Sequence, residues 1–91
     1  MAKYQIIVKP KAESDFLKIE KSGDKSSIKK LETIILELET HPYSGIGHPE
    51  ALKHHLSGYW SRRINKKDRL IYQVIEEPEK WVVIISALGH Y

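Results

Sequence analysis

The sequence predicts an α+β fold, in which two N-terminal helices pack on one face of a twisted, mostly antiparallel sheet. Three observations predict it: a β-branched run at residues 4–9, two following segments with helical apolar spacing, and four later runs of strand length separated by turn residues. Helices that precede a strand meander usually form a second layer on the sheet. The 91 residues suffice for one core, so we expect a single domain, 1–91.

The first strand and the first helix are marked by "YQIIVK" and the proline that follows it. Pro10 has a fixed φ that suits the first turn of a helix. Apolar residues then recur at helical spacing as far as Ile19, and Gly23 is a plausible end of the helix.

A second helix is predicted from Asp24, a plausible N-cap, to about Thr40. Its apolar positions follow helical periodicity, with lysines and glutamates on the other face. They are Ile28, Leu31, Ile35 and Leu38. Pro42 and the two glycines after it break the pattern, so "HPYSGIGHPE" is predicted to be a loop.

The second half is predicted to be an antiparallel meander. Its four strand-length runs are "ALKHHL", "GYWSRRI", "RLIYQVIE" and "WVVIISAL", separated by Ser-Gly, "NKKD" and "EPEK". With the first strand they complete the sheet, and the face without helices is expected to stay open for a ligand. Trp60, Tyr72 and Trp81 are interpreted as core aromatics rather than surfaces on which bases stack.

Composition excludes several classes of protein. The 41% hydrophobic content is that of a globular domain, and no apolar stretch approaches the roughly 20 residues of a membrane span. The N-terminus lacks the apolar core of a signal peptide, so we expect a cytoplasmic protein without a membrane partner. The absence of cysteine excludes disulfides, thiol nucleophiles and zinc-thiolate sites.

The middle of the chain is basic, although the net charge is only +3. Between residues 45 and 67 the only carboxylate is Glu50, among cations and histidines. Strand alternation puts Arg63 on the face opposite Arg62, and it lets Arg69 of the next strand converge with Arg63 on the open face. Two guanidiniums there would bind a phosphate, whereas the alternative is a solvated basic edge without a specific role.

RNA cleavage without a metal requires the groups that this chain offers. A base must take a proton from the 2′-hydroxyl, an acid must protonate the 5′-oxygen, and cations must stabilise the transition state. Glu50 is the candidate base and His90, near the end of the chain, is the candidate acid, because an imidazole exchanges its proton near neutral pH. The candidate cations are Lys53, Arg63 and Arg69, and Tyr91 is a candidate for stacking on a base.

Other chemistries find less support. Adjacent histidines at 54 and 55 would point to opposite faces of a strand and would not chelate one metal together. The serines lack the Gly-x-Ser-x-Gly context, and neither a P-loop nor a dinucleotide-binding pattern occurs. We therefore expect neither a metal nor a cofactor.

The segment "GIGHPEALKHHLSGYWSRRINKKDRLIYQV", together with the terminal "HY", resembles the YoeB-type toxins of the RelE/ParE superfamily. The likeness spans nearly the whole chain and is strongest over residues 45–72. It implies a RelE-like fold related to small microbial ribonucleases, and a toxin of a type II toxin-antitoxin system. It also implies a ribosome-dependent endoribonuclease that cuts mRNA in the A site without a metal, and so inhibits translation.

The resemblance assigns roles that agree with the chemical argument. It implies Glu50 as general base, His90 as general acid and Tyr91 as the terminal aromatic, with the three cations on the phosphate. The list of implied partners is mRNA, the ribosome, a cognate YefM-like antitoxin with a disordered segment, and a second copy in a homodimer.

Two departures from the family pattern occur at the site, and one alternative function remains open. Ile46 and His48 replace the lysines of the common Gly-Lys-Gly-Lys-Pro-Glu loop, and Leu88-Gly89 replaces a bulky pair before the terminal His-Tyr. The alternative is a catalytically weak or inactive module of the same fold that binds RNA, the ribosome or an antitoxin. A pure antitoxin is disfavoured, because the chain has neither a helix-turn-helix pattern nor an acidic disordered tail.

Overall fold

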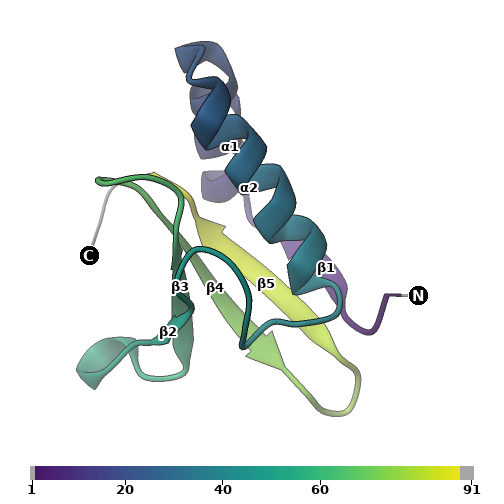
Figure 1. Cartoon of the computed structure of the whole chain (residues 1–91). Helices are drawn as coiled ribbons and strands as arrows, with labels where there is room; N and C mark the ends of the chain where they lie inside the picture. Colours follow the sequence, from purple (N-terminus) through teal and green to yellow (C-terminus); the bar gives the residue numbers. More distant parts are fainter. Residues whose placement is uncertain (1, 89–91) are drawn as a thin grey trace.

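Two helices lie on one face of a five-stranded sheet in the computed structural model, which describes residues 2–88 (Figure 1). The α+β prediction is therefore confirmed. In chain order the elements are β1 (Gln5–Val8), α1 (Pro10–Ser22), α2 (Lys25–Leu38), β2 (Glu50–Ala51), the short 3-10 helix η1 (His54–Leu56), β3 (Tyr59–Arg63), β4 (Arg69–Ile75) and β5 (Trp81–Ser86).

The sheet has the strand order β1-β5-β4-β3-β2. β1 runs parallel to β5, and the remaining neighbours are antiparallel, as the predicted meander requires. The ladder between β4 and β5 is irregular: Tyr72 pairs with Ile84, whereas Ile71 pairs with Ser86. Ile85 is thus an extra residue, and such a bulge changes which face the following residues occupy.

Local signals set the limits of both helices. Pro10 begins α1, and Gly23 ends it with a left-handed φ of 75° that glycine adopts without strain. The side chain of Asp24 accepts a hydrogen bond from the Ser27 amide at 3.2 Å and caps α2, which ends at Leu38 rather than near Thr40. Within residues 2–88, neither helix has the length and apolar character that would let it cross a membrane.

The hydrophobic core fills the space between the helices and the sheet. Buried members come from α1, α2, β4 and β5, and they include Ala12, Ile34, Leu38, Leu70, Tyr72, Val82 and Ile84. Tyr72 is a core aromatic, as predicted, whereas Trp60 and Trp81 are only half-buried. Trp60 packs against the core and contacts the ring of Tyr43 at a centroid distance of 5.1 Å.

The strand predicted at residues 51–56 is wrong beyond Ala51. Lys53 is extended, but His54 adopts a positive φ of 58°, which turns the chain into η1. The two adjacent histidines therefore lie in a helical turn and not on opposite faces of a strand. In the described part of the chain, no three His, Cys, Asp or Glu side chains are grouped so that they could hold a metal ion.

Glu76 gathers three donors at the end of β4. Its carboxylate accepts hydrogen bonds from the hydroxyls of Tyr4 and Tyr43 and from the Lys80 ammonium, which lies 2.7 Å away. These donors stabilise the ionised form, so they lower the pKa of Glu76 from 4.5 to about 2, with Lys80 the strongest influence. The cluster ties the N-terminus and the 41–48 loop to the sheet.

We expect Glu76 to titrate at about 2 in a carboxyl-detected NMR titration. The contribution of these contacts to stability should be complete above 4.5 and should disappear as the pH falls through the folded pKa. Lys80→Met should move the titration upward, whereas Lys66→Met, which alters a lysine outside the cluster, should not. Titration of Glu76 at the ordinary glutamate value would contradict this prediction.

Candidate functional site

Strand register places Glu50, Arg63 and Arg69 on the sheet face opposite the helices. Glu50 pairs with Ser61, and Arg63 pairs with Arg69. Paired residues share a face, as do residues two apart on one strand, so all four side chains lie on one side. The intervening Arg62 is fully buried on the helix side. The separation of the two adjacent arginines thus agrees with strand alternation.

Arg63 and Arg69 form a pair of like charges across neighbouring strands. Directly opposite residues have Cβ atoms about 4.5–5.5 Å apart, at which distance like charges destabilise each other. Arg63 is exposed and Arg69 is half-buried, so both can be reached from solvent. A bound phosphate would remove the repulsion and would accept hydrogen bonds from both guanidiniums.

Glu50 and Lys53 border a hollow beside β2, at the edge of the sheet. Glu50 is exposed and lies diagonally across from Arg63, a relation that corresponds to about 7–8 Å on a sheet. Residues 50–56 line the hollow, which has a volume of about 670 Å³. Lys53 is exposed in the turn before η1, so it belongs to a loop and not to the sheet.

Two of the candidate residues, His90 and Tyr91, lie outside the described residues. The described chain ends just beyond β5, which runs antiparallel to β4 and makes its last pair, between Ser86 and Ile71, near the start of β4. Arg69 occupies that same end of β4. Residues 87 and 88 therefore leave the sheet at the end where Arg69 lies.

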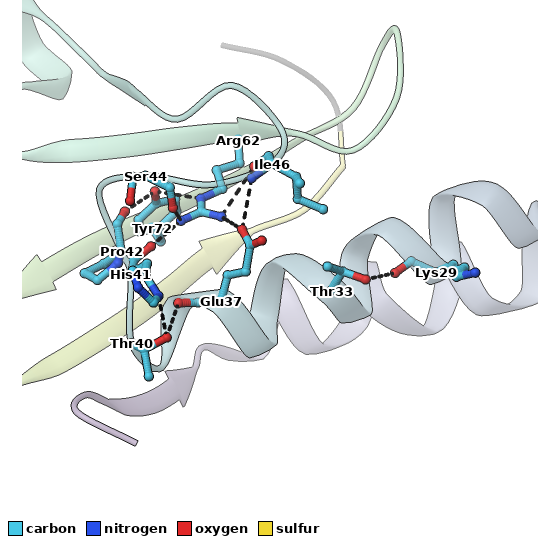
Figure 2. Close-up of polar contacts among 10 residues, drawn as sticks. All are labelled: Lys29, Thr33, Glu37, Thr40, His41, Pro42, Ser44, Ile46, Arg62 and Tyr72. Atoms are coloured by element: carbon cyan, nitrogen blue, oxygen red, sulfur yellow. Dashed lines mark hydrogen bonds and ion pairs between the residues drawn. The ribbon is translucent and has the colours of Figure 1, made fainter. Parts of the chain in front are cut away.

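Sequence reasoning missed the role of Arg62, which the structure places at the centre of a hydrogen-bond cluster (Figure 2). Its guanidinium contacts Glu37 of α2, the Tyr72 hydroxyl and several carbonyls of the 41–48 loop. A usable signal was present, because strand alternation puts Arg62 on the helix face, and a buried charge must be paired. Its partners were not evident, since they come from distant parts of the chain.

The Tyr72 hydroxyl belongs to the same hydrogen-bond cluster. Burial raises the pKa of this hydroxyl, although the neighbouring Arg62 opposes that effect. The neutral hydroxyl donates a hydrogen bond to the Pro42 carbonyl at 2.6 Å. Tyr72 therefore anchors the beginning of the same loop that Arg62 holds farther along.

The open face carries a carboxylate, Glu50, and the guanidiniums of Arg63 and Arg69. A carboxylate accepts a proton, and guanidiniums that are already in place stabilise negative charge as it develops. This combination suits acid-base chemistry on a phosphodiester, in which a hydroxyl is deprotonated next to a phosphate. The acid and the aromatic group of the predicted set belong to the part of the chain that is not described.

Comparisons with known proteins point to bacterial toxins. A family model described as "YoeB-like toxin of bacterial type II toxin-antitoxin system" matches residues 9–91. Toxin YoeB of Synechocystis is 44% identical over 69 residues, which are 76% of this chain and 77% of that protein. The YoeB dimer from Staphylococcus aureus has 36% identity and a TM-score of 0.80, with 99% of this chain and 100% of that chain covered. The heterotetrameric YoeB-YefM toxin-antitoxin complex from the same species has 36% identity, a TM-score of 0.77 and the same coverage.

Proposed function

The chain belongs to the YoeB-like toxins of bacterial type II toxin-antitoxin systems, and from that premise we propose that it is a ribosome-dependent mRNA endoribonuclease. It cuts mRNA in the ribosomal A site by acid-base catalysis without a metal, and thereby inhibits translation in the cytoplasm. The observation that supports this most directly is the position of Glu50, Arg63 and Arg69 on one open sheet face.

In the proposed reaction, Glu50 takes the proton of the 2′-hydroxyl. The 2′-oxygen then forms a bond to the phosphorus, and the bond from phosphorus to the 5′-oxygen breaks. His90 gives its proton to the leaving 5′-oxygen. The products are a 2′,3′-cyclic phosphate and a 5′-hydroxyl, so atoms and charges balance without a further reactant.

The remaining site residues act on charge and on position. Arg63 and Arg69 stabilise the extra negative charge of the phosphorane-like transition state, and Lys53 approaches the same phosphate from its loop. Tyr91 stacks on a base and orients it for attack. Arg63 and Arg69 lie on one sheet face in the free protein, and such an arrangement reduces the reorganisation needed when the charge develops.

We further propose two protein partners. The S. aureus YoeB in the complex named above is bound to YefM, and a separate structure is a YoeB dimer. By analogy, this chain binds a cognate YefM-like antitoxin, whose disordered segment folds on the toxin, and it forms a homodimer. Mixing the chain with such an antitoxin should suppress cleavage.

Primer-extension mapping of one mRNA in a purified translation system tests the proposal. The wild-type chain should produce cuts that require ribosomes and persist when EDTA is added after ribosomes have been fixed in place with a cross-linker. A Glu50→Ala/His90→Ala double variant should produce none. If the wild-type chain produced no cuts but still bound ribosomes or antitoxin, the proposed enzyme activity would be wrong and the chain would be a binding module.

A further inference from the structure

We infer that Arg62 is a positioning residue that holds the 41–48 loop and, through it, Glu50 in place. This inference rests on the proposed function, since it concerns the placement of the proposed base. Arg62 does not face the substrate side of the sheet, as its side chain is fully buried on the helix side. Its effect on the reaction must therefore pass through the loop and the neighbouring strand.

The guanidinium of Arg62 is surrounded by acceptors on several sides. One is a charge, Glu37 Oε1 at 2.7 Å, and the others are neutral oxygens. The neutral acceptors are the carbonyls of His41 at 2.5 Å, Ser44 at 2.7 Å and Ile46 at 3.4 Å, and the Tyr72 hydroxyl at 3.3 Å. One side chain therefore gathers three carbonyls of a loop that forms no helix or strand of its own.

The same cluster shapes the loop backbone from the other side. Glu37 Oε1 also accepts a hydrogen bond from the Ile46 amide at 3.0 Å. Glu37 and Arg62 therefore bind the backbone N–H and the backbone carbonyl of Ile46, respectively. Between Ser44 and Ile46, Gly45 has a φ of 125°, and a Cβ there would lie 2.1 Å from Glu37 Oε1. The close approach of loop and ion pair thus requires glycine.

Two backbone contacts connect this loop to the proposed site. The Arg63 amide donates a hydrogen bond to the Gly47 carbonyl at 2.5 Å, and Glu50 then pairs with Ser61. Arg62 lies between Ser61 and Arg63 on β3. Its side chain therefore holds the loop on the helix face of the sheet. Its two neighbours face the other side: Ser61 pairs with Glu50, and Arg63 is a proposed phosphate ligand.

Lysine cannot reproduce this arrangement. Arginine presents five N–H donors in a planar fork, which matches acceptors spread around its plane, whereas lysine is a point charge with three donors on one atom. Arg62→Lys would keep the charge next to Glu37 but would leave loop carbonyls without their partner. The substitution thus tests the hydrogen-bond geometry of Arg62 while the positive charge is kept.

The first measurement is amide hydrogen exchange and chemical shift in the isolated protein, for the wild type, Arg62→Lys and Glu37→Gln. We expect faster exchange at Ile46 and Arg63, and a shifted Glu50 amide, in Arg62→Lys, with smaller changes in Glu37→Gln. Ile19→Val, a core change on α1 outside these hydrogen bonds, is the control for lost stability and should leave the loop amides unchanged. Unchanged Ile46 and Glu50 amides in Arg62→Lys would overturn the inference.

The second measurement is the single-turnover cleavage rate below the melting temperature of every variant. A misplacement of about 1 Å can cost about 10²-fold in rate, so Arg62→Lys should lower the rate at least tenfold in the wild-type background. It should add little in the Glu50→Gln background, because the group that it positions is already lost. Equal losses in both backgrounds would indicate a merely structural role and overturn the inference. If the wild-type chain does not cut, the proposed function fails, and the amide measurement still decides whether Arg62 holds the loop.

Discussion

Replacing Glu50 with glutamine should lower the single-turnover rate of mRNA cleavage by about 10²- to 10⁴-fold, the usual contribution of general acid-base catalysis. Glutamine has nearly the same shape, but its amide cannot take the proton of the 2′-hydroxyl. Because Glu50 is exposed on the short strand β2, the substitution should change the free energy of unfolding by no more than about 0.5 kcal/mol. Quench-flow cleavage of ribosome-bound mRNA and thermal unfolding measure the two quantities.

Glu79→Gln is a matched control for this substitution. It makes the same chemical change at an exposed glutamate in the turn between β4 and β5, away from the arginine pair. Its cleavage rate should equal that of the wild type, and both variants should bind ribosomes with similar affinity. If Glu50→Gln retained a rate within a few-fold of the wild type, Glu50 would not be the base, and another proton acceptor would have to be sought.

Local signals explain why the helical half of the fold could be predicted from the sequence. Pro10, Gly23 and Asp24 act on the backbone within a few residues, so their effect does not depend on distant contacts. The 51–56 segment shows the opposite case. Its composition favours a strand, but the positive φ of His54 and the turn into η1 depend on how the chain meets its neighbours. The bulge at Ile85 is also a property of the pairing and not of the strand alone.

The candidate site, too, has features that local sequence signals predict and features that depend on distant contacts. Alternation along a strand is local geometry, and it correctly separated Arg63 from Arg62 and grouped Arg63 with Arg69. The partners of Arg62 could not be foreseen, because Glu37 is 25 residues earlier in the chain. A sequence pattern can show that a charge faces the core, but only the packed structure shows which groups compensate it.

A second buried charge, Asp15, holds the chain at the end of β5. This α1 residue is 1% exposed, and its Oδ2 accepts hydrogen bonds from the amides of Ala87 at 2.9 Å and Leu88 at 3.2 Å. Lys11 contributes an ion pair at 2.7 Å, but its side chain is 64% exposed. Asp15 therefore binds the chain where β5 has ended, immediately before residues 89–91.

Removing this acceptor should destabilise the protein strongly. Asp15→Ala leaves two amides without a partner, at a cost of about 1–3 kcal/mol for each buried group, so the loss should be on the order of 2–6 kcal/mol. Asp15→Asn should lose less, because the amide oxygen can still accept. Lys11→Met should cost at most about 1 kcal/mol, since the lysine is largely solvated. Urea unfolding of the three variants measures these differences, and a loss in Lys11→Met as large as in Asp15→Ala would show that the ion pair matters rather than the backbone contacts.

The difference between wild type and Asp15→Asn should also depend on pH. Burial acts to raise the pKa of Asp15, but hydrogen bonds from Ala87, Lys11 and Leu88 outweigh it, so the pKa lies below the ordinary value of 3.8. A carboxyl with a lowered pKa contributes its full stabilisation above 3.8 and loses it as the pH falls through the folded value. The stability advantage of the wild type should therefore be constant near neutral pH and shrink in acid. An advantage that grows as the pH falls would mean that Asp15 is protonated in the folded chain, and its contacts with Ala87 and Leu88 would then be those of a neutral acid.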